Sequence, residues 1–264
     1  MRCNAQDVCY IAPPPPPQLQ FETFNAFFYR ELKPGARPIA APRDGSVIVS
    51  PADSRMVVYP DLLEATRIWV KGRAFTVPAL LGPECADVAP LFEGGALVLA
   101  RLAPQDYHRW HLPVTGKLGR RHAIDGALYT VNPIAIRRNV PDVYTENKRE
   151  VLLVHTVEYG LVAMVAVGAT IVGSINIVLP DGTFQRKGAC HGYFAFGGST
   201  VLVLFQRGAV QFDADLVKNS RTPLETLVRV GERIGVAAPP TPGVVLQRGL
   251  AADDPLVVAD AAAP

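Results

Sequence analysis

Short apolar runs separated by glycine and proline dominate the hydrophobic pattern of this chain. The runs are rich in valine, leucine and isoleucine and are bounded by turn-forming residues, which is typical of buried strands. The chain also holds 22 glycines and 24 prolines, which suits many turns. The pattern therefore predicts a mostly β protein of the α+β class, with strands at residues 46–50, 67–70, 96–102, 151–156, 161–167 and 201–205.

Two helices are predicted beside these strands. Four phenylalanines at helical spacing predict a first helix that stops at the Lys-Pro-Gly of residues 33–35: Phe21, Phe24, Phe27 and Phe28. This aromatic face fits either core packing or contact with a membrane surface, and the sequence leaves both open. Apolar positions after a Thr-Pro start predict a second helix over residues 222–234.

The chain is long enough for one substantial domain. Hydrophobic residues make up 49% and charged residues 19%, which indicates a globular body. We expect a proline-rich tail at residues 1–18, one domain over residues 19–237 and a flexible tail at residues 238–264. Residues 160–179 carry no charge and are long enough to cross a bilayer, but their glycines and β-branched residues favour two buried strands.

Charge and cysteine content narrow the function classes. The net charge of +2 gives no reason to expect nucleic-acid binding and permits only a weak attraction to anionic lipid. The four cysteines are scattered without a CxxC pair, so neither a disulfide framework nor a zinc ribbon is expected. Together with the lack of an apolar signal core before the proline run, this favours an intracellular protein with reduced thiols.

The candidate chemistry starts at the Gly198–Ser199 bond. Two glycines here lead a hydroxyl residue into an apolar strand. Such a stretch is most often a turn, and it can also form a backbone nest for an anion. A third interpretation is a cut site, because a deprotonated Ser199 could attack the carbonyl of Gly198, whose backbone is unusually free.

Two histidines and an aspartate could supply the rest of such a site. His108 and His111 lie three apart between Pro104 and Pro113, and these prolines favour a short helical turn that would place both imidazoles on one face. Structural histidines or a metal pair are the alternatives, although HxxH alone is a poor zinc signal and we expect no metal. Asp53 lies in a loop after a predicted strand, where it could cap the backbone or orient a histidine.

Taken together, these stretches resemble the phosphatidylserine decarboxylase family. Any one motif is modest, but their joint order and spacing are specific and cover most of the chain. They look most like the branch with a GGST cleavage motif. The motifs are FNAFFYRELKPGARPI at residues 24–39, SPADSR at 50–55, KGRAFT at 71–76, DYHRWHLP at 106–113, YTENKR at 144–149 and GYFAFGGSTV at 192–201.

The resemblance implies a compact antiparallel β-rich fold and a zymogen that cuts itself. Ser199 would attack the Gly198 carbonyl, with His111 as base and Asp53 orienting His111. Residues 1–198 would become the β subunit, and the α subunit would begin at Ser199, converted to a pyruvoyl group that serves as the cofactor. This group would form a Schiff base with the substrate amine, and His108 would protonate the carbanion or position the substrate.

The implied substrate is phosphatidylserine, decarboxylated to phosphatidylethanolamine at a peripheral contact with a lipid membrane. No nucleic acid partner is implied, the compartment is left between peripheral membrane and cytoplasm, and a homodimer stays open. Many members of the family carry an N-terminal membrane segment, a targeting sequence or a lipid-binding domain, whereas we expect only a short proline-rich tail before the catalytic region here, so the chain departs from the family in its means of membrane attachment. The alternatives are a soluble pyruvoyl-dependent decarboxylase of a free amino acid and a non-catalytic β-rich relative.

Overall fold

A computed structural model describes most of the chain. The described residues are 8–9, 21–62, 75–131, 142–169, 174–195, 197, 199–222, 224–240, 243–247 and 249–250. The run predicted as a strand at residues 67–70 lies outside them, as do Gly198 and most of both predicted tails. Within them the protein is mostly β, and its paired strands are antiparallel, which confirms the predicted fold class.

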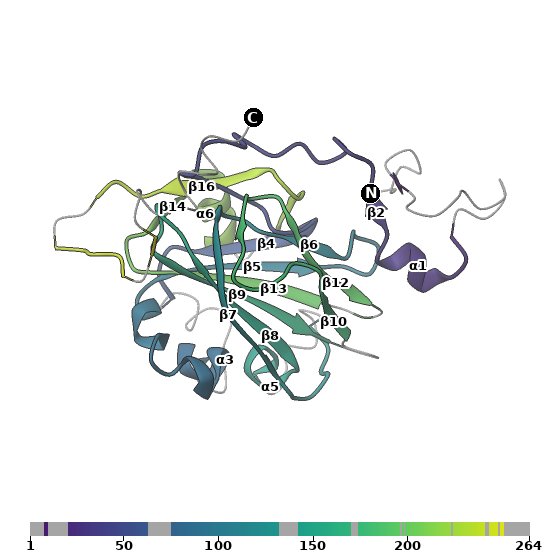
Figure 1. Cartoon of the computed structure of the whole chain (residues 1–264), viewed down its shortest axis with the longest axis horizontal. Coiled ribbons are helices and arrows are strands. Elements are labelled where there is room, and N and C mark those ends of the chain that lie inside the picture. The colour runs from purple at the N-terminus through teal and green to yellow at the C-terminus, as the bar shows by residue number, and fades with distance from the viewer. Residues whose placement is uncertain are drawn as a thin grey trace.

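An eight-stranded sheet forms the centre of the molecule (Figure 1). Its inner strands are largely buried on both faces, which explains why several read as continuous apolar runs rather than alternating ones. Five of the predicted strands are confirmed, four of them in this sheet. In spatial order the sheet contains β11 (Phe184–Gln185), β7 (Gly116–Ile124), β8 (Arg149–His155), β9 (Leu161–Gly168), β13 (Ser199–Phe205), β5 (Ala96–Leu102), β4 (Ser54–Tyr59) and β15 (Thr226–Val228).

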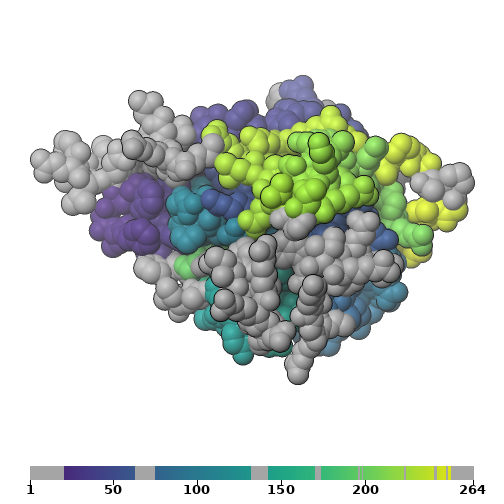
Figure 2. All heavy atoms as spheres, turned by 180° about the vertical axis from the view of Figure 1, so that it is seen from behind, coloured from purple at the N-terminus to yellow at the C-terminus, as the bar shows by residue number. Residues whose placement is uncertain are grey.

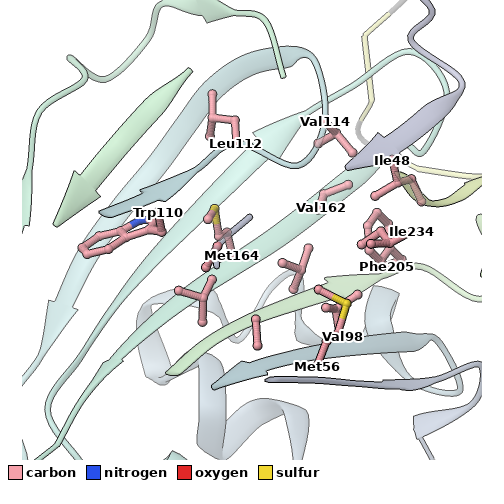
Figure 3. Packing of buried hydrophobic residues seen from close by; sticks show 14 of the residues in the cluster. Ile48, Met56, Val98, Trp110, Leu112, Val114, Val162, Met164, Phe205 and Ile234 are labelled. Atoms are coloured by element: carbon pink, nitrogen blue, oxygen red, sulfur yellow. The ribbon is translucent and has the colours of Figure 1, made fainter. Parts of the chain in front are cut away.

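Two three-stranded sheets cover one face of the central sheet. The side chains between the layers form a continuous core in which Trp110, Met164 and Phe205 are almost fully buried (Figure 3). Since apolar burial is the main favourable term in folding, this core holds the layers together. The two sheets are β10 (Ser174–Ile177), β12 (Cys190–Ala195) and β6 (Arg109–His111), and β14 (Val210–Phe212), β16 (Arg233–Ala237) and β3 (Val47–Val49).

Short helices cover the opposite face. They bury Leu80, Phe92 and Tyr144 against the central sheet in a second apolar cluster. The elements on this face are α3 (Val77–Leu81), η2 (Pro83–Cys85), η3 (Ala89–Phe92) and α5 (Val143–Glu146).

The first predicted helix is confirmed but is shorter than its pattern suggested. It is α1 (Phe24–Phe28), capped by the Thr23 hydroxyl, and the chain becomes extended before residues 33–35 because β2 (Glu31–Leu32) pairs with β1 (Val8–Cys9). In both views α1 lies at one end of the molecule (Figures 1 and 2).

The helix predicted over residues 222–234 is wrong. The helix in this region is α6 (Ala214–Arg221), which ends before the predicted start. The following residues form β15, which pairs along the edge of β4, and Gly231, at φ +83°, turns the chain into β16. Pairing along a sheet edge has outweighed a weak helical periodicity.

The uncharged stretch at residues 160–179 contains two strands, β9 and β10, as predicted, but only β9 is fully buried and β10 is half-buried. No helix within the described residues combines the length and the apolar character that crossing a bilayer requires.

His191 on β12 is a buried imidazole that packs in the core. Its ring meets Trp110 edge-on, with 6.3 Å between ring centroids, and its Nδ1 has no hydrogen-bond partner. Burial, helped by the nearby charge of Arg121 and opposed by that of Asp181, lowers the pKa of His191 to about 4. The native state therefore keeps this ring neutral at pH values where the unfolded chain protonates it.

This burial predicts acid sensitivity. Between the unfolded pKa of about 6.5 and the folded pKa of about 4, the unfolded state binds the extra proton, so stability falls as the pH falls. His191→Gln should remove about 2 kcal/mol of the stability difference between pH 7.5 and pH 5. Urea unfolding of the Ser199→Ala chain, with and without this change, measures it. The loss at pH 7.5 reports packing alone, and an equal loss at both pH values would contradict the prediction.

Candidate active site

Ser199 is the first residue of β13 and lies in the middle of the central sheet. It is fully buried, with Leu102 of β5 opposite on one side and Gly168 of β9 on the other. Its Oγ has no hydrogen-bond partner. Alternation along the strand directs this hydroxyl, like the Val201 side chain, to the face covered by the three-stranded sheets. The hydroxyl is therefore fixed by its backbone and held in an enclosed, largely apolar environment.

The two histidines do not share a helical turn, so that expectation is wrong. The chain turns at residues 103–106 and then runs extended into β6, which pairs with β12 opposite Cys190 and Tyr193. The amide of Phe194 also donates to the carbonyl of His108, which extends the pairing back toward the turn. Sheet pairing thus fixes an extended backbone, and the two imidazoles have different partners.

His108 is buried and clamped. Its ring stacks on Phe28 of α1 with centroids 3.7 Å apart, and its Nδ1 is 2.9 Å from the carbonyl oxygen of Asp106. Because only a protonated nitrogen can donate to a carbonyl, Nε2 carries the lone pair, and it has no partner. Burial lowers the pKa of His108 to about 4, which the Asp106 bond opposes and the charge of Arg30 reinforces. His108 is thus a neutral imidazole with an open acceptor.

His111 is held at both ring nitrogens. Nδ1 lies 2.8 Å from the carbonyl oxygen of Gly188, and Nε2 lies 3.0 Å from the hydroxyl of Tyr107. Burial lowers the pKa of His111, while the Gly188 bond and the charge of Asp53 raise it. Gly188 has φ +84°, and an added Cβ would lie 2.5 Å from the Ile39 side chain, so glycine is required where this carbonyl is presented.

Asp53 lies beside this site but does not hydrogen-bond to His111. Its carboxylate accepts a bidentate pair of bonds from Arg37, at 3.0 and 2.6 Å, and one from the amide of Val230 at 2.9 Å. The amide of His111 donates to Pro51, which brings the Asp53 loop alongside β6. Asp53 therefore acts on the His111 ring through its charge.

The site combines one enclosed serine hydroxyl with two neutral imidazoles. A buried hydroxyl without a partner is available as a nucleophile, because no hydrogen bond in the fold uses it. Ser199 is not hydrogen-bonded to either histidine in this arrangement. Across the described residues, no three histidine, cysteine, aspartate or glutamate side chains gather as a metal site would need.

Several residues that shape the site could not be recognised as functional from the sequence. Tyr107 and Arg37 lie inside motifs that carry the family resemblance. No spacing rule, however, links a tyrosine to a histidine four residues later in an extended chain, or an arginine to Asp53. Gly188 lies outside all of these motifs. The sequence marks Phe28 only as one of the helix phenylalanines, because its contact with His108 depends on long-range packing.

Comparison with known proteins places these residues in a family. A family model described as phosphatidylserine decarboxylase matches residues 24–236. "Phosphatidylserine decarboxylase proenzyme 2" of Oryza sativa subsp. japonica is 51% identical over 84% of this chain and 35% of its own length. "Phosphatidylserine decarboxylase proenzyme 3" of Schizosaccharomyces pombe is 50% identical over 81% of this chain and 22% of its own length.

A bacterial relative has a length closer to that of this chain. "Phosphatidylserine decarboxylase proenzyme" of Chlamydia trachomatis serovar L2 is 42% identical over 83% of this chain and 71% of its own length. The chain thus spans about a third or less of the plant and fungal relatives and most of the chlamydial one. The extent of the family match and these identities show that the chain belongs to the phosphatidylserine decarboxylase family.

Proposed function

We propose that this protein is a self-processing phosphatidylserine decarboxylase, cut at the Gly198–Ser199 bond. The observation that carries the proposal is the Ser199 hydroxyl, which is fully buried without a hydrogen-bond partner. An unsatisfied buried polar group costs about 1–3 kcal/mol, so a serine here works against stability. Its placement after Gly197 and Gly198, together with family membership, supports a chemical role.

In the proposed cleavage, Ser199 attacks the preceding peptide bond. Its Oγ gives its proton to His111 and bonds to the Gly198 carbonyl carbon. The carbon–nitrogen bond then breaks, the nitrogen takes up a proton, and an ester remains. Loss of the Cα proton breaks the ester's Cβ–oxygen bond, which leaves a carboxylate on Gly198. Water replaces the nitrogen at residue 199 and ammonia leaves, giving the pyruvoyl group. The charge of Asp53 favours the imidazolium formed on the way.

The fold keeps the two fragments together after the cut. Strand β13 would begin the α subunit, whereas its neighbours β5 and β9 would belong to the β subunit. Seven residue pairs on each side continue to hold β13 in place, from Ser199 to Phe205. The new terminus thus stays in the position that the strand gave to Ser199.

A pyruvoyl group at residue 199 would supply the electron sink that decarboxylation of an α-amino acid needs. We assign His108 to proton transfer or substrate positioning beside it. The open Nε2 of a neutral, enclosed imidazole can accept a proton from a substrate amine and return it to carbon. Phe28 and the Asp106 carbonyl fix the ring, so this acceptor keeps one direction. The apolar surroundings favour the loss of charge that accompanies departure of carbon dioxide.

The self-cleavage proposal predicts the behaviour of two neighbouring hydroxyl deletions. Ser199→Ala should leave one full-length chain, because no nucleophile remains. Thr200→Val should still cleave, since the Thr200 hydroxyl is also buried without a partner but points to the other face of β13. Denaturing electrophoresis separates the cases. Mass measurement of the smaller wild-type fragment should show a terminus lighter than serine by one ammonia. A full-length wild-type chain identical to Ser199→Ala would contradict self-cleavage.

The lipid substrate is tested separately. Cleaved protein should release carbon dioxide from phosphatidylserine in mixed micelles and not from free serine, with Ser199→Ala as the inactive control. Turnover of free amino acid alone would replace the lipid proposal with the soluble decarboxylase alternative. A cleaved chain inactive on both would support the non-catalytic alternative.

We also propose peripheral contact of α1 with a lipid surface. The Phe24 side chain is 63% exposed, although the same helix buries Phe28 against His108. Phe24→Asp should weaken co-sedimentation with vesicles containing phosphatidylserine, because it places a carboxylate on this apolar surface. Val245→Asp is the matched control, since Val245 is 79% exposed and lies outside α1. Equal vesicle binding by both variants would contradict the contact.

A further inference from the structure

Tyr107 contacts His111 from within the same extended segment. The tyrosine is 3% exposed, and its hydroxyl lies 3.0 Å from Nε2 of His111, with ring centroids 5.7 Å apart. A buried tyrosine hydroxyl and a buried histidine nitrogen each require a hydrogen-bond partner, and here each is the partner of the other. The contact therefore limits the orientation and the tautomer that the His111 ring can adopt.

The direction of this hydrogen bond follows from the other side of the ring. The carbonyl of Gly188 can only accept, so the neutral His111 ring carries its proton on Nδ1. Nε2 then holds the lone pair, and the Tyr107 hydroxyl must be the donor. One tautomer and one ring orientation satisfy both bonds, whereas the flipped ring would lose both.

We propose that Tyr107 is a positioning residue for the base of self-cleavage. Its hydroxyl and the Gly188 carbonyl together select the tautomer whose lone pair is on Nε2 and hold that nitrogen in place, and the hydroxyl then turns its own proton away so that Nε2 can take one from Ser199. The role deepens the proposed function and rests on it. It assigns the orientation of His111 to Tyr107 and Gly188, whereas Asp53 is engaged by Arg37 and Val230.

The charged and titratable groups around the His111 ring determine how its protonation should respond when Tyr107 is removed. Asp53 favours the imidazolium, and Arg109 on β6 disfavours it. Cys190 faces His111 across the β6–β12 pair, where burial raises the pKa of its thiol and keeps it neutral. The Tyr107 hydroxyl donates to Nε2 of the neutral ring and would accept a stronger, charge-assisted bond from Nε2–H of the imidazolium, so its loss should make His111 harder to protonate.

The first experiment follows His111 by nuclear magnetic resonance in the uncleaved Ser199→Ala chain. Adding Tyr107→Phe should decrease the proton affinity of His111 about fivefold, because a charge-assisted hydrogen bond to the imidazolium is about 1 kcal/mol stronger than the neutral bond lost with it. The ring nitrogen shifts should also show loss of the single Nδ1–H tautomer. His111→Gln assigns the signals. Tyr59→Phe is the matched control, because it removes a buried hydroxyl that has no partner. An unchanged titration and tautomer in Tyr107→Phe would overturn the proposal.

The second experiment measures self-cleavage of freshly refolded chains against pH. Tyr107→Phe should lower the plateau rate at least about tenfold through lost orientation and should shift the acid limb to lower pH, whereas Tyr59→Phe should change neither. A plateau that is unchanged or faster would overturn a positioning role. If the wild-type chain fails to cleave, the proposed function fails, while the titration in the Ser199→Ala chain still decides whether Tyr107 sets the state of His111.

Discussion

The pairing of β13 on both sides is the constraint on which the rest of the structure depends. The strand lies between β9 and β5, and each of its residues from Ser199 to Phe205 has a partner in both neighbours. Every one of these residues is buried, so their backbone groups must be satisfied by the sheet. Shifting the strand by one residue would exchange its two apolar faces and move the Ser199 hydroxyl to the helical side. The register therefore determines where the nucleophile lies.

Burial, more than ionic pairing, decides the state of the site's imidazoles. It is the largest influence on the pKa of both His108 and His111, and it outweighs the charge of Asp53 on the latter. Both rings are neutral as a result, each with its lone pair on Nε2. Their difference lies in the partner of that nitrogen, since it is open in His108 and bonded to Tyr107 in His111. Two histidines three residues apart thus acquire separate chemistry through local contacts.

The sequence predicted what depends on composition and on single strands. Apolar runs located β3, β5, β8, β9 and β13, because a strand buried on both faces leaves a continuous signal. The sequence-based prediction was wrong where pairing with a neighbouring strand decided the secondary structure. The segment that forms β15 carries helical periodicity and becomes a strand only through contact with β4. The helical turn predicted for His108 and His111 is wrong for the same reason, because pairing with β12 imposes an extended backbone on β6. Tyr107 and Gly188 needed the folded chain, because 77 residues separate Gly188 from His111.

The pairing of Asp53 with Arg37 changes the meaning of the aspartate. A carboxylate free to bond to Nδ1 of His111 would both orient the ring and stabilise its charged form. Here the Gly188 carbonyl occupies Nδ1, and Asp53 shares its charge with a guanidinium. A carbonyl can orient the ring but cannot neutralise an imidazolium, whereas a carboxylate at a distance can lower the cost of that charge without fixing geometry. Orientation and charge stabilisation therefore reside in different groups, joined by the loop that carries Pro51 and Asp53 beside β6.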